Sequence, residues 1–507
     1  MDGEHKQGGD ACPDLKAVEA EVRKCFEDLL RFCQKDESKF HRFEPTLFKK
    51  LFALGRLLVL VWLLSRNRRL RVHYNEQKYR VGQVHAERKL QTVFGEVTYG
   101  RLHLRRRRGG GCGYHPLDVA LGLSRDGFSP MVISFVTRLA TRVSYDSARL
   151  ICQQAWGWSP STETLHALVL GLGRHAHHYV EAGQWWRRRK KTKQDGEVLV
   201  IEADGKCPPT ATEAELEKRR GPRQGCPYCC QRHRGQNKRK QRGPKRRRKK
   251  GDKSKNGKEA MVIVMYTLRR GTDGLLHGPI NKKVWGTFAG RRAAAEWARA
   301  EATRRGFPPN RNGDVQVLVD GANGLEHNLR RLFDGAIFTL DVRHVEERIW
   351  TAGRAFHREA SPELAAWVKE RRQLLYERRP SAFLAWLQAE QQSWTGRRGG
   401  RGRVQALQKL IDYVQPRLSM LNYAMLKRKD LVLASGQVEG AVRYVVGQRF
   451  DCSGMRWRVE NAEPLLQLRC LEINGDWHDF FAWILRKNDK KLQRGEKVQI
   501  RAKSKIA

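Results

Sequence analysis

The sequence has no long uninterrupted apolar run. Its best apolar stretch, Leu51 to Leu64, contains Arg56 and is shorter than the roughly 20 residues that a helix needs to cross a bilayer. We therefore expect no membrane-spanning segment and predict that this stretch is a buried helix. The first residues, Met1 to Gln7, lack a basic start followed by an apolar core, so no secretory signal is expected and the protein is predicted to stay inside the cell.

Acidic residues are scarce beside basic ones. The chain has 54 Asp and Glu against 99 Lys and Arg, which gives a formal net charge of +45 at pH 7. Solubility alone does not require so large an excess, so the composition predicts a large polyanionic partner. Nucleic acid is the first expectation and an anionic membrane surface the second. At 507 residues the chain is too long for one ordinary core, and roughly two to four domains are expected.

The cysteines do not form the pattern of a disulfide framework. There are 11 of them, an odd number scattered through a long chain, which favours reduced thiols. One group, Cys226, Cys229, Cys230 and His233, offers four soft ligands for zinc. A closed structural zinc site normally takes its two ligand pairs from different turns, whereas these pairs abut. A structural Zn²⁺ site is therefore one interpretation, and a knuckle completed by Cys207 or free thiols are the alternatives.

Changes in composition and in the period of the apolar residues divide the chain into six predicted regions. The regions are a helical N-terminal region (1–80), a β-hairpin (81–115), a helical, helix-turn-helix-like DNA-binding region (116–195), a catalytic core (196–350) with a basic, cysteine-containing insertion (206–258), an α-helical insertion (351–432), and a helix that completes the core together with a basic C-terminal tail (433–507).

The third region contains the pattern of a helix-turn-helix. Tyr145 to Trp156 is predicted as one helix and 161–172 as a second, with Ser159 as the capping residue and Pro160 at the first helical position. Such a pair would place three side chains in a major groove, namely Ser161, Thr162 and His166. The alternative is a helix pair in an ordinary bundle without DNA contact.

The insertion in the fourth region is strongly basic. Between Lys238 and Lys258 it carries 13 Lys or Arg and a single acidic residue, Asp252. A segment with so many like charges cannot fold alone. We expect it to bind phosphates without reading sequence, and its candidate DNA contacts are Lys245, Arg246, Arg247 and Arg248.

Three carboxylates are predicted to lie where elements of the core begin or end. Asp204 and Asp320 each close an aliphatic run and precede a glycine, so their carboxylates are expected at the carboxyl ends of strands. Glu439 lies in a segment of helical period. The predicted order of three strands, a helix, a strand, a helix and a strand is that of an α/β, ribonuclease-H-like mixed sheet. The expected strands are 197–205, 260–268, 284–288, 315–319 and 336–340.

Carboxylates in these positions can hold a pair of divalent cations. Phosphodiester cleavage needs a deprotonated oxygen nucleophile and a stabilised leaving oxygen, and two metal ions about 3.5 to 4 Å apart provide both. Magnesium prefers carboxylate and water oxygens, so Mg²⁺ (or Mn²⁺) is the expected cofactor. Because Asp-Gly is also a common turn dipeptide, ordinary surface turns are the alternative.

Five blocks of the sequence resemble bacterial insertion-sequence transposases of the ISKra4 type, over about residues 90 to 480. The blocks are Val93 to Val97, Pro116 to Leu123, Asp320 to Ala322, Leu340 to Trp350, and Gly436 to Ala441 with Gly454 to Trp457 and Leu468 to Arg469. The resemblance implies a DDE transposase that acts on the terminal inverted repeats of its own element. It also implies a ribonuclease-H-like catalytic domain interrupted by an α-helical insertion.

The same resemblance implies a role for each acidic residue. Asp204 would bridge both metal ions, Asp320 would bind one and Glu439 the other. His344 would contact the scissile phosphate or a flipped base, with a core or helix-capping histidine as the alternative. Asp341 would orient His344 or lie beside the DNA.

Several further residues are candidates near this site. Arg343, Arg348 and Arg456 are predicted phosphate contacts. Glu202 lies two residues before Asp204 and points to the same face of the strand, so it is the main rival for the first metal ligand. Because Glu202 lies deeper in the strand, Asp204 is preferred.

Double-stranded DNA, both element ends and target, is the expected partner. The protein would act near the nucleoid in a bacterial cytoplasm, as a homo-oligomer because two ends must be joined. Two alternatives come from other classes: a non-catalytic DNA-binding protein, such as a regulator or a degenerate copy, and a nuclease with the same metal site but without strand transfer.

Overall fold

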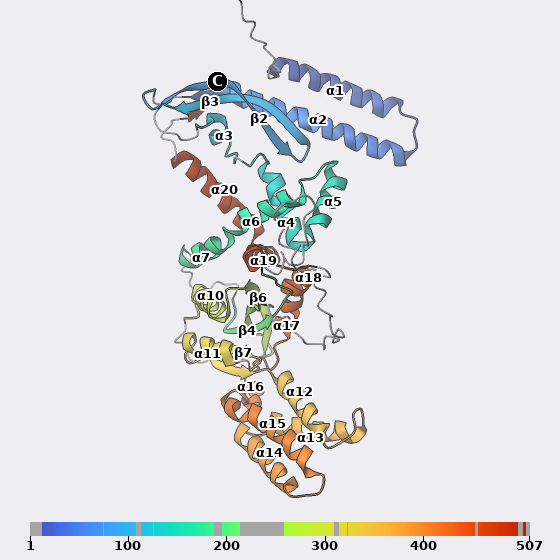
Figure 1. Ribbon diagram of the computed structural model, residues 1–507, viewed down its shortest axis with the longest axis vertical. Helices are drawn as coiled ribbons and strands as arrows, with labels where there is room; N and C mark the ends of the chain where they lie inside the picture. The colour runs from blue at the N-terminus through green and yellow to red at the C-terminus, as the bar shows by residue number, and fades with distance from the viewer. Residues whose placement is uncertain are drawn as a thin grey trace, which may run out of the picture. The chain divides into compact units, whose positions relative to one another are not determined.

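A computed structural model describes most of the chain (Figure 1). The described residues are 13–72, 74, 76–107, 113–124, 126–186, 195–212, 258–308, 314–321, 323–451, 455–494 and 500–502. The zinc candidates Cys226, Cys229, Cys230 and His233 and the candidate DNA contacts Lys245 to Arg248 lie outside them. The chain divides into two compact units, residues 1–171 with 477–507 and residues 172–476. None of the helices in the described part is long and apolar enough to cross a membrane.

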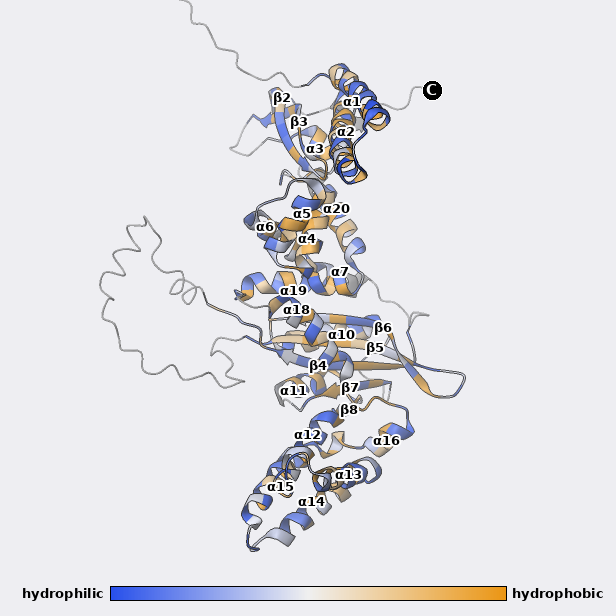
Figure 2. Ribbon diagram, turned by 90° about the vertical axis from the view of Figure 1, so that its right-hand side faces the viewer, coloured by the Kyte–Doolittle hydropathy of each residue, from blue (hydrophilic) through white to orange (hydrophobic). Residues whose placement is uncertain are grey.

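The first unit begins with a helical hairpin of α1 (Leu15–Lys35) and α2 (Phe40–Arg69). The two helices lie side by side (Figure 1), with Phe32 stacked on Phe43 at a centroid distance of 5.2 Å. Both helices carry hydrophilic and hydrophobic segments (Figure 2). The predicted burial of the stretch 51–64 is wrong in part, because only Leu63 and Leu64 of α2 are fully buried. The α1 helix and the β-hairpin both pack on α2, and several large apolar side chains of α2 stay exposed.

The predicted β-hairpin is confirmed. Strands β2 (Tyr79–Thr92) and β3 (Gly95–Arg106) pair antiparallel, and Gly95 closes the turn with a φ of 107° that favours glycine. A second, short antiparallel pair joins β1 (Leu70–Val72) to β9 (Ile500–Ala502). The remaining elements of this unit are α3 (Pro116–Ala120), α4 (Pro130–Arg142), α5 (Tyr145–Trp156), most of α6 (Thr162–Gly173) and α20 (Trp477–Arg494).

The helix α20 packs in the first unit, although the sequence grouped it with the catalytic helix. Trp477 is almost fully buried, and its indole Nε1–H donates a hydrogen bond to the Ser134 hydroxyl of α4 at 3.0 Å. The predicted region 433–507 is thus divided between the two units. A contact between residues so far apart in the chain leaves no local signal in the sequence.

The second unit is built on a mixed five-stranded sheet in the order β6-β5-β4-β7-β8. Within this sheet β4, β5 and β6 pair antiparallel, while β7 joins β4 in parallel and β8 joins β7 in parallel. The strands are β4 (Val198–Lys206), β5 (Ala260–Arg270), β6 (Leu276–Thr287), β7 (Val315–Val319) and β8 (Ile337–Leu340). All five were predicted, but β6 begins at Leu276 rather than at the expected residue 284. The prediction missed its first half because that half is polar and contains Pro279.

Helices cover both faces of this sheet. On one face, α10 (Arg291–Arg304) and α11 (Asn323–Leu332) share a core with Leu199, Ile201 and Ala203 of β4. On the other, α17 (Gly436–Ala441) contacts β4 and β5, and Leu466 of α19 (Val459–Ile473) lies against Gly286 of β6. The helix α7 (Ala176–Trp186) packs on α19. The second unit is therefore a mixed α/β structure.

An all-helical segment separates β8 from α17. It contains α12 (Val342–Gly353), α13 (Pro362–Glu377), α14 (Pro380–Trp394), α15 (Gly400–Val414), a 3₁₀ turn (Gln415–Met420) and α16 (Tyr423–Arg428). Within it the buried Arg371 guanidinium carbon lies 4.1 Å from the ring centroid of Trp367 and 4.5 Å from that of Trp386. Its Nη2 pairs with Glu390 Oε1 at 2.7 Å. The predicted helical insertion is confirmed as a set of helices, and its core is continuous with that of the sheet.

Candidate functional site

Asp204 lies on β4, the central strand of the sheet, close to its carboxyl end. The backbone N–H of Gly205 donates a hydrogen bond to its Oδ1 at 2.6 Å. The pKa of Asp204 is raised overall, mainly by burial and further by the negative charges of Asp320 and Glu439. The hydrogen bond from Gly205 and the charge of His344 oppose this rise. The charges of Asp320, Glu439 and His344 therefore reach Asp204, which puts these three side chains in its neighbourhood.

The turn that carries Asp320 is fixed by the helical segment. The Tyr413 hydroxyl donates to the backbone carbonyl of Asp320 at 3.1 Å, and Arg417 Nη2 donates to that of Gly321 at 2.8 Å. Gly321 has a φ of 86°, and an added Cβ would lie 3.0 Å from Arg417 and 3.1 Å from the Tyr413 hydroxyl. Arg348 and Arg417 both lie over the Tyr413 ring, and burial raises the pKa of this tyrosine to about 12.

Glu202 is fully buried and holds the first turn of α17. Its Oε1 accepts a hydrogen bond from the Tyr266 hydroxyl at 2.7 Å, and its Oε2 accepts one from the backbone N–H of Val438 at 2.8 Å. Burial raises the pKa of Glu202, and these hydrogen bonds oppose that rise. Glu202 thus anchors the helix that presents the exposed Glu439, which supports Asp204 over Glu202 as the strand's exposed carboxylate.

Asp341 has a structural position rather than a surface one. It is fully buried at the N-cap of α12, where its Oδ1 accepts from Arg343 N at 2.8 Å. Its Oδ2 accepts from the backbone N–H of Ser435 at 3.1 Å and from the Ser435 hydroxyl. The prediction that Asp341 lies beside DNA is therefore wrong, because a carboxylate without exposed surface cannot contact a duplex. Asp341 instead joins the start of α12 to the residue before α17.

His344 lies on the first turn of α12 with 37% of its side chain exposed, and its Nδ1 is 3.5 Å from Glu347. This exposure excludes the core-histidine alternative. The predicted phosphate contacts Arg343, Arg348 and Arg456 are all exposed, on α12 and just before α19.

Arg291, which sequence analysis did not predict, belongs to the same neighbourhood. It begins α10 and pairs with Glu259 at 3.0 Å. The pKa of Arg291 is raised, first by this hydrogen bond and also by the charge of Asp320. Arg291 is therefore a cation whose charge interacts with one of the three carboxylates, Asp320.

The carboxylate set fits a hard divalent cation in its chemistry. Asp204, Asp320 and Glu439 offer only oxygen donors. Burial is the main cause that raises the pKa of Asp204, and a bound cation would relieve the repulsion from Asp320 and Glu439 that adds to this rise. Among the described residues, however, no three His, Cys, Asp or Glu side chains are close enough to form a metal site as they stand. These side chains would hold a metal only after moving toward one another.

The first unit contains the predicted helix pair, α5 and α6. The capping prediction is wrong, because Ser161 rather than Ser159 caps α6 by accepting a hydrogen bond from Thr164 N at 3.2 Å. His166 packs edge-on against Tyr145 at a centroid distance of 5.5 Å, and Ser161 is exposed. Of the three side chains predicted to enter a DNA major groove, His166 is therefore partly engaged in packing within the protein.

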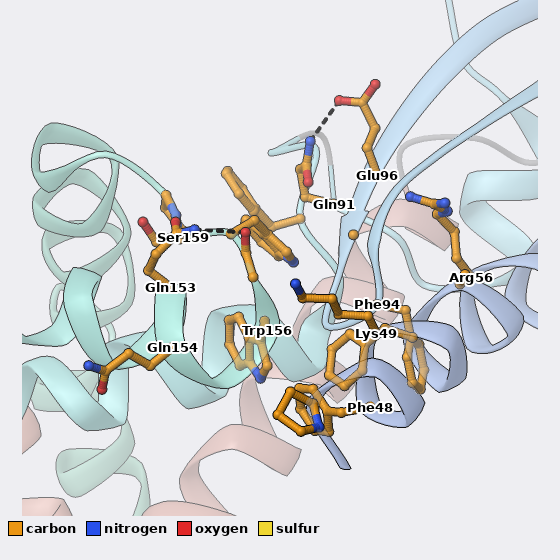
Figure 3. Close-up of a pocket in the computed structure, with 18 of the residues that line it drawn as sticks. Phe48, Lys49, Arg56, Gln91, Phe94, Glu96, Gln153, Gln154, Trp156 and Ser159 are labelled. Carbon is orange, nitrogen blue, oxygen red and sulfur yellow. Dashed lines mark hydrogen bonds between the residues drawn. The ribbon is translucent and has the colours of Figure 1, made fainter. Parts of the chain in front are cut away.

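A groove of about 1140 Å³ lies between α2, the β-hairpin turn and the turn from α5 to α6. Figure 3 shows Phe48, Lys49 and Phe94 on one side and Trp156, Gln153 and Gln154 on the other. Gln91 donates a hydrogen bond to Glu96 at 2.7 Å at its edge. The indole N–H of Trp158, which also lines the groove, is buried and has no hydrogen-bond partner among the described residues. Sequence analysis predicted the hairpin and the helix pair but not the space that they enclose with α2.

A model of an uncharacterised protein family, UPF0236, matches residues 34–221. This segment is less than half of the chain. It runs from the end of α1 beyond β4 and so includes the groove and Asp204, but neither Asp320 nor Glu439. No match was found among curated proteins.

Proposed function

We propose that this chain is a DDE transposase that binds the terminal inverted repeats of an insertion sequence and catalyses metal-dependent DNA cleavage and strand transfer. The observation that carries the proposal is the placement of Asp204 and Asp320 at the carboxyl ends of the neighbouring parallel strands β4 and β7, with α17, which carries Glu439, held on β4 through Glu202. Acidic residues from three separate elements of the second unit are thus carried by one part of the sheet and the helix packed on it, which unrelated surface turns would not explain.

The strand order supports a ribonuclease-H-like fold. Three antiparallel strands are followed by two parallel ones, with the first strand at the centre of the sheet. In an open sheet of this kind, ligands bind beyond the carboxyl ends of the parallel strands. Asp204 and Asp320 come from the ends of β4 and β7, which are such neighbouring parallel strands.

The proposed reaction has two steps. In the first, water attacks a phosphorus atom at the element end and the bond from phosphorus to the 3′ oxygen breaks, which leaves a 5′ phosphate and a 3′ hydroxyl that takes up the proton lost by the water. In the second, this 3′ hydroxyl attacks a phosphorus atom of target DNA, forms a new phosphodiester bond and releases a 3′ hydroxyl of the target strand. When bound, two Mg²⁺ or Mn²⁺ ions would lower the pKa of the attacking oxygen and stabilise the leaving one. Asp204, Asp320 and Glu439 would hold them.

Other side chains of the site would act on the DNA. His344 would donate a hydrogen bond to the scissile phosphate, and exposed arginines would fix the backbone of the duplex. The +45 net charge fits such a polyanionic substrate, and action near the nucleoid of a bacterial cytoplasm is part of the proposal.

The proposal is tested with labelled DNA that carries the ends flanking the gene, in Mg²⁺ or Mn²⁺. Asp204→Asn, Asp320→Asn and Glu439→Gln are each expected to abolish cleavage and strand transfer while end binding stays largely intact. Glu296→Gln, a change of an exposed carboxylate on α10, is the matched control. Full activity in any variant of the three would remove that residue from the mechanism, and cleavage without joining would make the protein a nuclease.

His344→Ala belongs to the same experiment. One lost hydrogen bond to a charged group is worth about 1.5 to 3 kcal/mol, which corresponds to a cleavage rate roughly ten to a hundred times lower. Because the side chain is partly exposed, the melting temperature should hardly change. A fall of several degrees with normal cleavage would contradict the catalytic role.

A further inference from the structure

The helical hairpin of α1 and α2 leaves large apolar side chains in water. Leu51, Leu58 and Trp62 of α2 are 45%, 49% and 49% exposed. On α1, Phe26 and Leu30 are exposed to a similar extent. In α1 and α2 together, four residues are fully buried, namely Val18, Leu29, Leu63 and Leu64. Apolar side chains exposed in such numbers on one pair of helices indicate an interaction surface.

The exposed side chains of each helix share one side of that helix. At about 100° per residue, Leu51, Leu58 and Trp62 fall within about 40° of one another around α2. Phe26 and Leu30 are four residues apart and so share a side of α1, which packs along α2. We call these five exposed side chains of the two packed helices the hairpin face: Phe26, Leu30, Leu51, Leu58 and Trp62.

The α2 helix has the spacing of a coiled-coil seam along this face. Leu47, Leu51, Leu54, Leu58 and Val61 follow one another at intervals of four, three, four and three residues. This alternation keeps a stripe turned toward a neighbouring helix so that side chains interlock. None of the five is fully buried, and Leu51 and Leu58 are exposed.

The charges at the two ends of the stripe fit a second copy of α2. Glu44 and Arg66 are exposed on the same side of the helix and stand 22 residues apart. If two α2 helices pair antiparallel about Gly55, Glu44 of each copy faces Arg66 of the other. A two-fold axis repeats this match, as a self-complementary interface requires.

We propose that the hairpin face binds the hairpin face of a second copy of this chain, so that two hairpins form a four-helix bundle. The interface involves no residue of the carboxylate site, and the proposal does not depend on the chemistry of that site. It places the DNA-contacting elements of two chains in one assembly. A seam of alternating three- and four-residue spacing fits a helix better than the flat, wide contact of a lipid surface.

The first test measures the mass of the full-length chain, freed of nucleic acid at high salt, by sedimentation equilibrium. The unmodified protein is expected to be a dimer at micromolar concentration. The double variant Leu51→Glu/Leu58→Glu should be monomeric, with a dissociation constant at least a hundredfold higher. Leu275→Glu is the matched control, since Leu275 is 49% exposed on a turn of the other unit. Circular dichroism and the melting temperature show that each variant is folded.

The second test exchanges the charges. Glu44→Arg and Arg66→Glu should each weaken dimerisation about tenfold, and the double variant should restore it because the pair is rebuilt with opposite signs. A monomeric unmodified protein, a dimer that survives Leu51→Glu/Leu58→Glu, or a double charge variant no better than either single one would overturn the proposal. Binding of the monomer to phosphatidylserine vesicles, lost with the two leucines, would assign the face to a membrane instead.

Discussion

Among single residues, Glu202 shows best how the fold positions the candidate site. Its carboxylate has no exposed surface and accepts two hydrogen bonds, one from Tyr266 of β5 and one from Val438 of α17. Glu202 thereby links the central strand β4 to both elements. Glu439 is the residue after Val438, so the hydrogen bond fixes the backbone from which Glu439 projects. Glu202 is a positioning residue in this proposal.

Glu202→Gln tests that role. An amide has one acceptor oxygen where the carboxylate has two, so one buried donor loses its partner, at a cost of about 1 to 3 kcal/mol. We expect a lower melting temperature and a lower rate of single-turnover cleavage, with DNA affinity little changed. Tyr266→Phe is the comparison, since it removes one hydrogen bond and leaves that of Val438. Cleavage at the normal rate by folded Glu202→Gln would contradict a positioning role.

His115 makes the stability of the first unit depend on pH. It is the residue before α3, its Nδ1 is 3.2 Å from the Leu102 carbonyl and its ring stacks on His103. Burial lowers the pKa of His115 below 6.5, Arg101 and His103 lower it further, and Asp118 and the Leu102 carbonyl oppose them. The folded state therefore binds fewer protons than the unfolded state just below pH 6.5, so stability falls as the pH falls through this range.

His115→Gln should flatten this dependence. The free energy of unfolding, measured with urea at about pH 7.5 and about pH 5.5, should change less in the variant than in the unmodified protein. His85→Gln, at an exposed position of β2, is the matched control. An unchanged slope in His115→Gln would assign the dependence to other groups.

A residue of the site could be predicted from the sequence when its signal lies in neighbouring positions of the chain, and not when its partner lies far away in the chain. Asp204 and Asp320 are predictable because each ends a run of aliphatic residues, a signal contained in a few neighbouring positions. Tyr266 and Arg417 could not be predicted, because their partners lie 64 and 96 residues away. The catalytic use of the carboxylates remains a proposal.

At the scale of elements, the helical segment acts on the site through Tyr413. This residue of α15 packs against two guanidinium groups and donates to the carbonyl of Asp320. Tyr413→Phe keeps the ring and removes this hydrogen bond. We expect a loss of about 0.5 to 1.5 kcal/mol in unfolding free energy and slower cleavage.

The matched control for this change is Tyr376→Phe. Its hydroxyl donates to Glu346 at 2.9 Å, within the same helical segment but without a bond to the Asp320 turn. Differential scanning fluorimetry and a cleavage assay on both variants separate the effects. Equal losses of cleavage in the two would mean that the Asp320 turn does not need Tyr413.

The order of the elements was predicted better than their ends. The aliphatic runs of β4, β5 and β7 are continuous because both faces of these strands are buried. The segment around Glu439 was predicted to be helical, and it is, but the α-helix α17 ends at Ala441 and a π-helix follows over Val442–Gly447. A π-helix keeps the apolar composition of an α-helix, so the sequence pattern did not distinguish them.

At the scale of the whole molecule, we expect the net charge of +45 to govern the proposed affinity for DNA. Deleting 238–258 removes 13 basic residues and one acidic residue. We expect weaker binding to element ends and to random duplexes alike, and a shallower dependence of the binding constant on salt, because fewer counterions are released. Fluorescence anisotropy at several salt concentrations measures both. A loss confined to the element ends would make the segment a sequence reader.

The two ends of the helical segment meet where they leave the sheet. The backbone N–H of Val342 donates to the Leu433 carbonyl at 3.0 Å. The buried Gln316 side chain of β7 donates a hydrogen bond to the Val432 carbonyl at 2.6 Å and accepts one from the backbone N–H of Val432 at 3.0 Å. It thus satisfies both backbone groups of Val432, as the backbone of a neighbouring strand would. The cost of closing a loop grows only with the logarithm of its length. Relatives could therefore gain or lose helices between these two points during evolution, and Glu439 would keep its place.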